Sequence, residues 1–261
     1  MVNIPYFQFT TVYLGPIPIK VWGLFVALGI VVSFFILQRQ CKKEDTKYRE
    51  LVERIFFVVV ISGFIGARLG HVLWYEWAYY SQHLAQIFAL WRGGWSSYGG
   101  FMGAAIALIY FQMKYKGVDW KKLYDRCAYA FVWGWFVGRL GCFLIHDHPG
   151  RPCHGCLLGV EYPDGTVRAD LGLYDGLLAL FIGVILVVGK KIGWFKKTGS
   201  MVTTLILGYT IPRFFLDFLR AAPSDLTPGD ARYFGLTPAQ YISVAMVLVI
   251  AYFLILKKKR A

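Results

Sequence analysis

The chain has 261 residues, of which 57% are hydrophobic and only 16% are charged. Soluble domains carry roughly 45–50% apolar and 25% charged residues, so this composition argues against a water-soluble fold. The 28 Lys and Arg residues outnumber the 15 Asp and Glu residues and give a net charge of +13. Their positions along the chain show whether that positive charge indicates nucleic-acid binding or the topology of a membrane protein.

Seven apolar runs follow one another along the chain. They lie at about 21–37, 55–75, 98–113, 127–145, 171–189, 199–219 and 239–256. Each run is close to the ~20 residues that a helix needs to cross a bilayer. We therefore predict an all-α polytopic membrane protein with about seven transmembrane helices, forming one membrane-embedded domain over residues 1–261. Its two larger outer loops are expected at about 147–170 and 220–238.

The basic residues alternate between the connections. Nineteen of the 28 lie in the 38–54, 114–126 and 190–197 loops and in the 257–260 tail. The positive-inside rule makes these segments cytoplasmic, so the N-terminus is predicted outside and the C-terminus inside. This distribution explains the net charge without a nucleic-acid partner. Because the first seven residues, MVNIPYF, contain no basic residue, we expect no removable signal peptide.

Three arginines lie within the apolar runs: Arg68, Arg139 and Arg213. An arginine at the centre of a spanning helix costs roughly 2.5–3.5 kcal/mol on insertion scales, so it usually faces a cavity or a partner. All three runs are predicted to cross from inside to outside, with the arginine in the outer half. The three side chains are therefore expected at a similar depth, near the outer leaflet.

Polar residues repeat with helical spacing around two of these arginines, so each set is predicted to share one helix face. The sets are Arg139, Cys142 and His146 at i, i+3 and i+7, and Arg213, Asp217 and Arg220 at i, i+4 and i+7. Asp175, at the start of the fifth run, and His71 belong to the same layer.

Two explanations of this charged layer remain open. The pairs Arg213 with Asp217 and Arg68 with Asp175 would tie helices together as structural ion pairs, or the arginines would snorkel to the interface. Alternatively, several guanidinium groups in a partly dry cavity would bind a lipid phosphate, because guanidinium offers planar, bidentate donors.

A glycine-rich stretch, residues 93–103, opens the third run from the outside. Its glycines permit close backbone approach, and the following helix N-terminus presents free N–H groups to an anion. For Gly100 and Gly103, packing between helices is the favoured explanation.

Five segments resemble the bacterial prolipoprotein diacylglyceryl transferase family, and together they extend from the first run to the sixth. They are Val21–Leu24, Gly66–Gly70, Trp95–Gly103, Val137–Phe143 continuing to Gly150–Arg151, and Arg213–Arg220. The segment Gly138-Arg139-Leu140-Gly141-Cys142-Phe143 is the most specific. The resemblance implies transfer of the diacylglyceryl group of phosphatidylglycerol to the lipobox cysteine thiol in a prolipoprotein signal peptide. A thioether forms and glycerol phosphate leaves, at the bacterial inner membrane and among its lipids.

The resemblance also implies roles for individual residues, with no cofactor and no metal. Arg139 and Arg213 would stabilise the departing phosphate as catalytic residues. The residues expected to bind substrate are Arg68, Gly99, Gly100, Cys142, Asp147, Arg151, Asp175, Asp217 and Arg220.

The chain departs from the family pattern around the expected base. Tyr98 stands where the family has His before Gly-Gly, and Cys142 stands where it has Asn. The run Ile145–Arg151 replaces an Asn-Gly-Glu sequence, with Asp147 in place of the acid. Because Tyr titrates near 10 and His near 6.5, we hypothesise that His146 or His148 is the base and Tyr98 a hydrogen-bond donor.

Three alternatives remain. His146, Asp147 and His148 with Cys153, His154 and Cys156 would suit a metal, although the two cysteines would equally form a disulfide or stay free. Buried arginines would also line the path of a transporter, but no repeat or pair of broken helices is visible. A family member with altered activity, acting on another acceptor, is the third.

Overall fold

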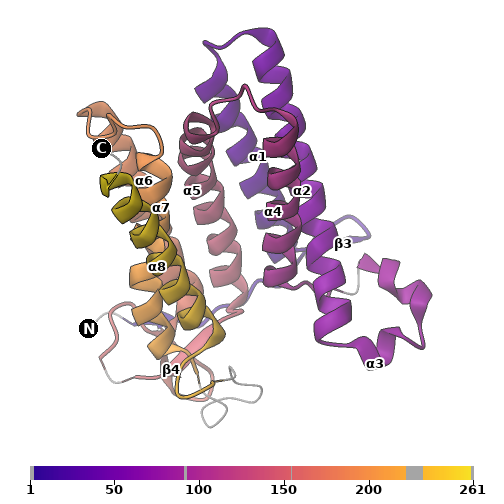
Figure 1. The fold of residues 1–261 in the computed structure, drawn as a ribbon. Coiled ribbons are helices and arrows are strands. Elements are labelled where there is room, and N and C mark those ends of the chain that lie inside the picture. Colours follow the sequence, from indigo (N-terminus) through magenta and orange to yellow (C-terminus); the bar gives the residue numbers. More distant parts are fainter. Residues whose placement is uncertain (1–2, 91–92, 154, 222–231, 260–261) are drawn as a thin grey trace. The chain divides into compact units, whose positions relative to one another are not determined.

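The computed structural model describes residues 3–90, 93–153, 155–221 and 232–259. The chain divides into two compact units (Figure 1). The first unit comprises residues 1–37 and 121–261, and the second comprises residues 38–120.

The first unit is a set of long helices with a small sheet at one end (Figure 1). Its helices are α1 (Val21–Cys41, which continues into the second unit), α5 (Trp120–Ile145), α6 (Leu171–Lys191), α7 (Ser200–Leu216), the 3₁₀ helix η3 (Asp217–Leu219) and α8 (Pro238–Lys259). Because α5 to α8 alternate in direction, the end of α5, the start of α6, the end of α7 and the start of α8 meet beside the sheet. Polar residues from distant parts of the sequence therefore gather there.

Side chains fix where these helices begin. Asp170 caps α6 by accepting from the Leu173 N–H at 3.0 Å. The α7 N-terminus is capped by Asp125 of α5, whose carboxylate accepts from the backbone N–H groups of Gly199 and Val202 at 2.7 and 2.9 Å. A carboxylate at a helix N-terminus satisfies N–H groups that have no partner within the helix.

The predicted outer loop at 147–170 contains most of the small sheet, which the all-α expectation missed. Its strands are β1 (Ile4–Pro5), β4 (Pro149–Pro152), β5 (Val160–Glu161) and β6 (Val167–Asp170), in the order β1-β5-β6-β4. β6 is antiparallel to both neighbours and β1 is parallel to β5, with Ile4 opposite Val160. Strands β2 (Thr11–Leu14) and β3 (Ile17–Lys20) form a separate hairpin.

The second unit is built on α2 (Thr46–Trp74) packed against α4 (Ser97–Lys114), with α3 (Trp77–Tyr80) and η1 (Leu84–Phe88) between them in sequence. Glycines set the close approach of α2 and α4. A Cβ at Gly99 would contact the Gly66 carbonyl oxygen, and a Cβ at Gly103 would contact that of Ser62. Gly100 is less tightly packed, because a Cβ added there would lie 3.4 Å from the Gly63 carbonyl oxygen. The packing explanation for Gly103 is confirmed, since small residues let helix backbones approach.

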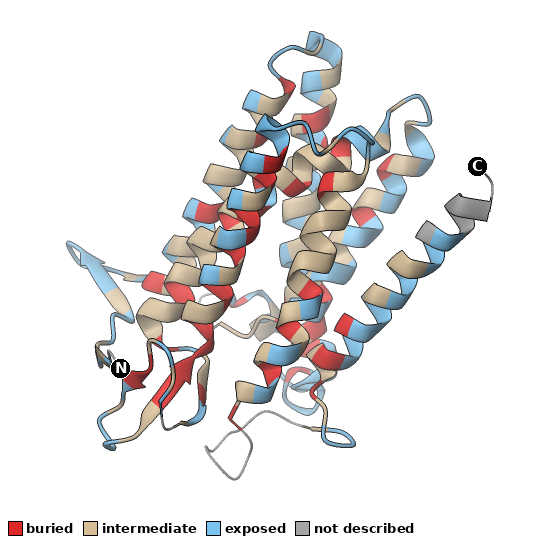
Figure 2. Cartoon of the chain, turned by 90° about the vertical axis from the view of Figure 1, so that its left-hand side faces the viewer, coloured by how far each residue is buried: buried red, intermediate tan, exposed pale blue. Residues whose placement is uncertain are grey.

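Helices lie at all seven predicted runs, several with longer bounds. α2 begins at Thr46 and α5 at Trp120, because charged residues extend both helices beyond their apolar parts. Among the described residues, five helices are long and apolar enough to cross a membrane: Val21–Cys41, Thr46–Trp74, Trp120–Ile145, Leu171–Lys191 and Ser200–Leu219. Exposed residues, many of them large and apolar, run along the helices (Figure 2). These features are those of a multi-pass membrane protein.

Candidate functional site

A buried carboxylate at the start of α6 joins two helices. Asp175 accepts an ion pair from Arg139 of α5 at 3.1 Å and from Arg213 of α7 at 2.5 Å, both on the same oxygen. Its side chain is 1% exposed, against 17% for Arg139 and 10% for Arg213. The structural-pair explanation had offered Arg68 as the partner of Asp175, whereas the ion pairs of Asp175 here are with Arg139 and Arg213. Asp175 instead brings the two guanidinium groups predicted to be catalytic together.

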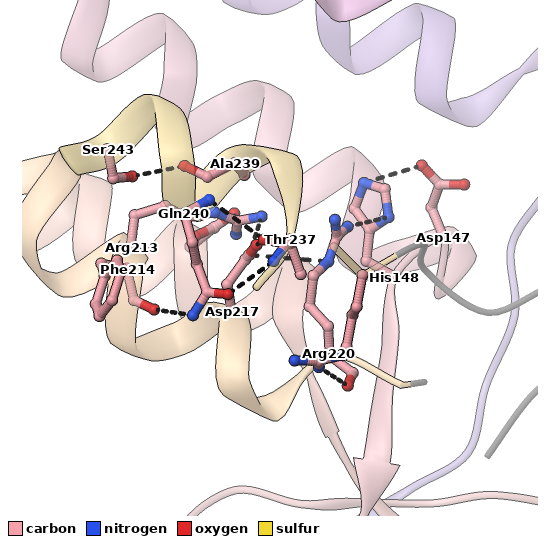
Figure 3. Close-up of polar contacts among 12 residues, drawn as sticks. Asp147, His148, Arg213, Phe214, Asp217, Arg220, Thr237, Ala239, Gln240 and Ser243 are labelled. Atoms are coloured by element: carbon pink, nitrogen blue, oxygen red, sulfur yellow. Dashed lines mark hydrogen bonds and ion pairs between the residues drawn. The ribbon is translucent and has the colours of Figure 1, made fainter. Parts of the chain in front are cut away.

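A second buried carboxylate extends this cluster. Asp217, fully buried, pairs with Arg213 at 2.7 Å, as its i+4 spacing predicted, and lies 3.9 Å from the Arg220 Nε. The Thr237 hydroxyl donates to its other oxygen. Figure 3 shows Arg213 beside Asp217. With Asp175 as its other partner, Arg213 is paired with two carboxylates, which fix the direction of its guanidinium group.

Thr237 and Gln240 support Asp217 through a capping box at the start of α8. The Gln240 side chain accepts from the Thr237 N–H at 2.9 Å, and the Thr237 hydroxyl accepts from the Gln240 N–H at 3.2 Å. Gln240 also donates to the Phe214 carbonyl at 3.0 Å. Neither residue was predicted from the sequence, although the pattern Thr-x-x-Gln at the start of an apolar run is a recognisable signal.

The cluster carries more positive than negative charge. Arg139, Arg213 and Arg220 contribute three positive charges against the two of Asp175 and Asp217. An anion bound beside these side chains would neutralise the excess positive charge, because unpaired charge in a poorly hydrated site is costly. The Trp135 ring lies 5.1 Å from the Arg139 guanidinium carbon and covers one face of that group.

His148 lies between Arg220 and Asp147, just beyond the end of α5 (Figure 3). Its Nδ1 is 3.4 Å from Arg220 Nη2, and its Nε2 is 3.4 Å from the Asp147 carboxylate. Burial, followed by the charges of Arg220, Arg139 and Arg213, lowers the pKa of His148 to about 3. A neutral imidazole with that pKa is a weak base. Desolvation raises the pKa of Asp147, against the opposing effect of nearby arginines.

His146, the other predicted base, is bound into the fold. Its Nδ1 lies 2.7 Å from the fully buried Asp170, and its ring stacks on Tyr6 with ring centroids 4.9 Å apart. α5 ends at Ile145, and His146 has a left-handed φ of +50°. The spacing predicted that His146 shares a helix face with Arg139 and Cys142. In the structure its side chain instead points to Asp170 at the start of α6.

The turn at His146 brings Asp147 back over the end of α5. The Asp147 N–H donates to the Cys142 carbonyl at 3.2 Å. Cys142 is buried, and its sulfur lies 4.0 Å from Arg139 Nη1, as the i+3 spacing predicted. Cys142, Asp147 and Arg139 therefore share one end of α5.

Arg68, in the second unit, donates to backbone carbonyls. Its guanidinium reaches Ile87 at 2.8 Å, Gly93 at 2.6 Å and Gln86 at 2.9 Å, with longer bonds to Gly94 and Ala89. The side chain is 4% exposed. This arrangement secures the segment before α4 and occupies the donors that substrate binding would use.

Tyr98, Gly99 and Gly100 occupy the first turn of α4. The side chain of Ser96 caps this helix by accepting from the Gly99 N–H at 3.2 Å. Tyr98 is 38% exposed, whereas Gly99 is buried against α2. The structure thus gives Gly99 a packing function and leaves the Tyr98 ring accessible.

The six-residue metal cluster considered from the sequence does not form as expected. Cys153 and Cys156 are joined in a disulfide, and His146 is engaged by Asp170. His154 lies outside the described residues. Arg151, on β4, is exposed at the edge of the sheet.

Comparisons with known proteins agree with the resemblance seen in the sequence. The family model described as prolipoprotein diacylglyceryl transferase matches residues 10–256. A phosphatidylglycerol–prolipoprotein diacylglyceryl transferase of Nitrosomonas europaea is 30% identical over 251 residues, covering 93% of this chain and 87% of the relative. A protein of the same name from Bacillus cereus is 28% identical over 98% of this chain and 94% of its own length. The corresponding protein of Staphylococcus haemolyticus is 28% identical over 95% and 87%.

Proposed function

This chain belongs to the prolipoprotein diacylglyceryl transferase family, and from that premise we propose that it transfers the diacylglyceryl group of phosphatidylglycerol to the lipobox cysteine thiol of a prolipoprotein signal peptide. The observation that carries the proposal for this chain is the Arg139, Asp175, Arg213 and Asp217 cluster. Arg139 and Arg213 share a buried carboxylate, and together with Arg220 they carry three positive charges against the two of Asp175 and Asp217.

The phosphate of phosphatidylglycerol binds beside Arg139 and Arg213 in this proposal. The substrate thiolate attacks the terminal diacylglyceryl carbon, so that a C–S bond forms and the C–O bond to phosphate breaks. The bonding electron pair stays on the phosphate oxygen, and glycerol phosphate leaves with one more negative charge until it takes up the thiol proton. Guanidinium groups held by buried carboxylates stabilise that charge without reorganising during the reaction.

The surrounding residues orient this phosphate site. Asp175 and Asp217 direct the guanidinium groups, Arg220 adds a third positive charge, and Arg151 on the neighbouring strand binds the polar headgroup. The weak basicity of His148 favours a hydrogen-bonding function for that residue. His146 supports the turn through Asp170.

The other residues named from the sequence lie in the second unit. Arg68 supports the segment before α4 through its carbonyl contacts. Gly99 and Gly100 permit the packing of α2 and α4, and Tyr98 donates a hydrogen bond to a substrate.

We extend the proposal to seven spans in the bacterial inner membrane, with α4 and α8 completing the five longer apolar helices. The N-terminus is outside and the C-terminus cytoplasmic, because the basic residues gather in alternate connections. With that orientation the arginine cluster lies at the outer end of the helices, where an outer-leaflet phospholipid and a translocated signal peptide meet.

Complementation tests this function. A bacterium depleted of its resident transferase receives this chain, and thioether-linked diacylglyceryl on a reporter lipoprotein is measured by mass spectrometry. We expect lipidation with the unmodified chain and with Arg49→Gln, whose exposed arginine lies at the start of α2. Arg139→Ala should reduce the rate of transfer by about 10²–10³-fold, the typical effect of losing one group that stabilises developing negative charge. Absence of thioether product from the correctly inserted, unmodified chain would refute the function.

A further inference from the structure

Three possible metal ligands of different chemistry meet at the end of α5. Cys142, Asp147 and His148 each offer one ligand atom, and these atoms all lie within 4.8 Å of one another. The cysteine is buried, the histidine half-buried and the carboxylate exposed, so the group opens from the protein interior towards its surface. A sulfur, a carboxylate oxygen and an imidazole nitrogen are all ligands that zinc accepts.

The backbone builds this group rather than leaving it to flexible side chains. The left-handed His146 residue turns the chain after α5, and the Asp147 N–H returns to the Cys142 carbonyl at 3.2 Å. The buried pair of His146 with Asp170, at 2.7 Å, holds this turn. The three ligands are thus presented by a fixed helix end.

We propose that Cys142, Asp147 and His148 bind a zinc-like divalent cation, whose fourth position accepts the substrate thiol. Three protein ligands with one open position are typical of catalytic zinc, whereas structural sites are closed by four. The two anionic ligands, thiolate and carboxylate, balance the charge of the dication. Arg139 Nη1 lies 4.0 Å from the sulfur.

The role of the cation in transfer rests on the proposed function. A thiol that coordinates zinc loses its proton, so the metal supplies the nucleophile, and His148 serves as a ligand rather than as a base. The zinc-bound thiolate attacks the diacylglyceryl carbon, the C–O bond breaks, and the thiol proton ends on the departing glycerol phosphate. No electrons are exchanged with an external reagent. The product thioether is a weaker ligand than a thiolate and leaves the metal.

The geometry also predicts that cation binding breaks the hydrogen bond between Arg220 and His148. His148 Nε2 faces Asp147 at 3.4 Å and is the nitrogen placed to bind the cation. Its Nδ1 then carries the proton and no longer accepts from Arg220, which lies 3.4 Å away. The guanidinium group would turn towards the phosphate, so cation and phospholipid should bind cooperatively.

The test uses the full chain, without a polyhistidine tag, in lipid nanodiscs loaded with Co²⁺. We expect one Co²⁺ per chain, with an intense near-ultraviolet thiolate charge-transfer band and the visible bands of tetrahedral cobalt. Cys142→Ser should abolish the charge-transfer band. Cys127→Ser, which removes a half-buried thiol from the same helix, should retain it. Asp147→Asn should keep the band and weaken zinc affinity by more than the roughly 10–100-fold that loss of an outer hydrogen-bonding partner costs.

The outcomes separate this inference from the transferase function. A band unchanged in Cys142→Ser, or no stoichiometric cobalt in the unmodified chain, overturns the metal site whatever the activity. Metal binding without lipidation refutes the transferase function and leaves the site standing. We expect Asp147→Asn to melt at the same temperature as the unmodified chain, which would show that its weaker affinity is not a folding defect. Adding phosphatidylglycerol should tighten zinc binding in the unmodified chain and not in Arg220→Gln.

Discussion

Replacing Asp175 by asparagine gives the sharpest test of the arginine cluster. The amide keeps the shape of the side chain and removes one negative charge from a group that is 1% exposed. Arg139 then loses its carboxylate partner at 3.1 Å, whereas Arg213 keeps Asp217 at 2.7 Å. Removing one partner of a buried ion pair typically costs about 3–5 kcal/mol, because the other charge stays behind.

The same substitution raises the charge of the cluster of three arginines and two aspartates from +1 to +2. An anionic headgroup bound there should recover part of the lost stability. Thermal unfolding is therefore compared in nanodiscs of phosphatidylglycerol and of zwitterionic phosphatidylcholine. We expect Asp175→Asn to lower the melting temperature in both, and by less in phosphatidylglycerol.

Asp164→Asn is the matched control, since this aspartate also pairs with an arginine, at 3.3 Å from Arg168, but is 54% exposed. Exposed ion pairs contribute little, so its effect should be small and independent of the headgroup. Equal destabilisation of Asp175→Asn in both lipids would refute the inference that the cluster binds an anion. An unchanged melting temperature would refute the buried pairing itself.

Three further predictions concern groups around the site. The pKa of His148 is about 3 in the folded protein and 6.5 in the unfolded chain, so the folded protein binds fewer protons between these values and loses stability as the pH falls through that range. The raised pKa of Asp147 has the opposite effect, so the comparison is made in an Asp147→Asn background. In that background, His148→Gln should make the melting temperature depend less on pH. Thr237→Val removes the α8 cap and a donor to Asp217, and should lower the free energy of unfolding by about 1–2 kcal/mol in denaturant titration, whereas unchanged stability would contradict the capping assignment. Gly103→Ala, whose Cβ meets the Ser62 carbonyl, should cost about 1–3 kcal/mol by the same measurement, while Gly117→Ala, with nothing within 4 Å, should not.

The helices were predictable because apolar runs long enough for a bilayer have few alternative structures. The run at 171–189 became α6, Leu171–Lys191, almost without change. The strands were not predictable in the same way. Val160 and Glu161 form only a two-residue strand, and its pairing with Ile4 depends on residues more than 150 positions earlier in the sequence.

Local spacing predicted part of the site and failed where the backbone changed direction. The i+4 pair of Arg213 and Asp217 is present because both residues lie on consecutive turns. The i+7 spacing predicted that His146 lies on the same helix face as Arg139. The helix ends at Ile145, however, and His146 itself has a left-handed φ, so its side chain does not continue that face. The partner of Asp175 depended on which helices pack together, and no local pattern in α6 identifies Arg139 over Arg68.

This chain departs from the family pattern near the expected base and not at the residues that would hold the phosphate. Arg139 and Arg213, which would hold the phosphate, and Asp217, which orients Arg213, match the pattern and are connected with Asp175 by ion pairs. Tyr98 and Cys142 depart from it, and Tyr98 stands where the family has the histidine that would serve as the base. Stabilising a leaving phosphate requires fixed positive charge, whereas a thiolate can be produced by a base or by a Lewis acid. A chain with Tyr98 in place of the family's histidine, yet with the arginines proposed to hold the phosphate, would therefore need another source of thiolate, and a cation held by the proposed ligands Cys142, Asp147 and His148 would supply it.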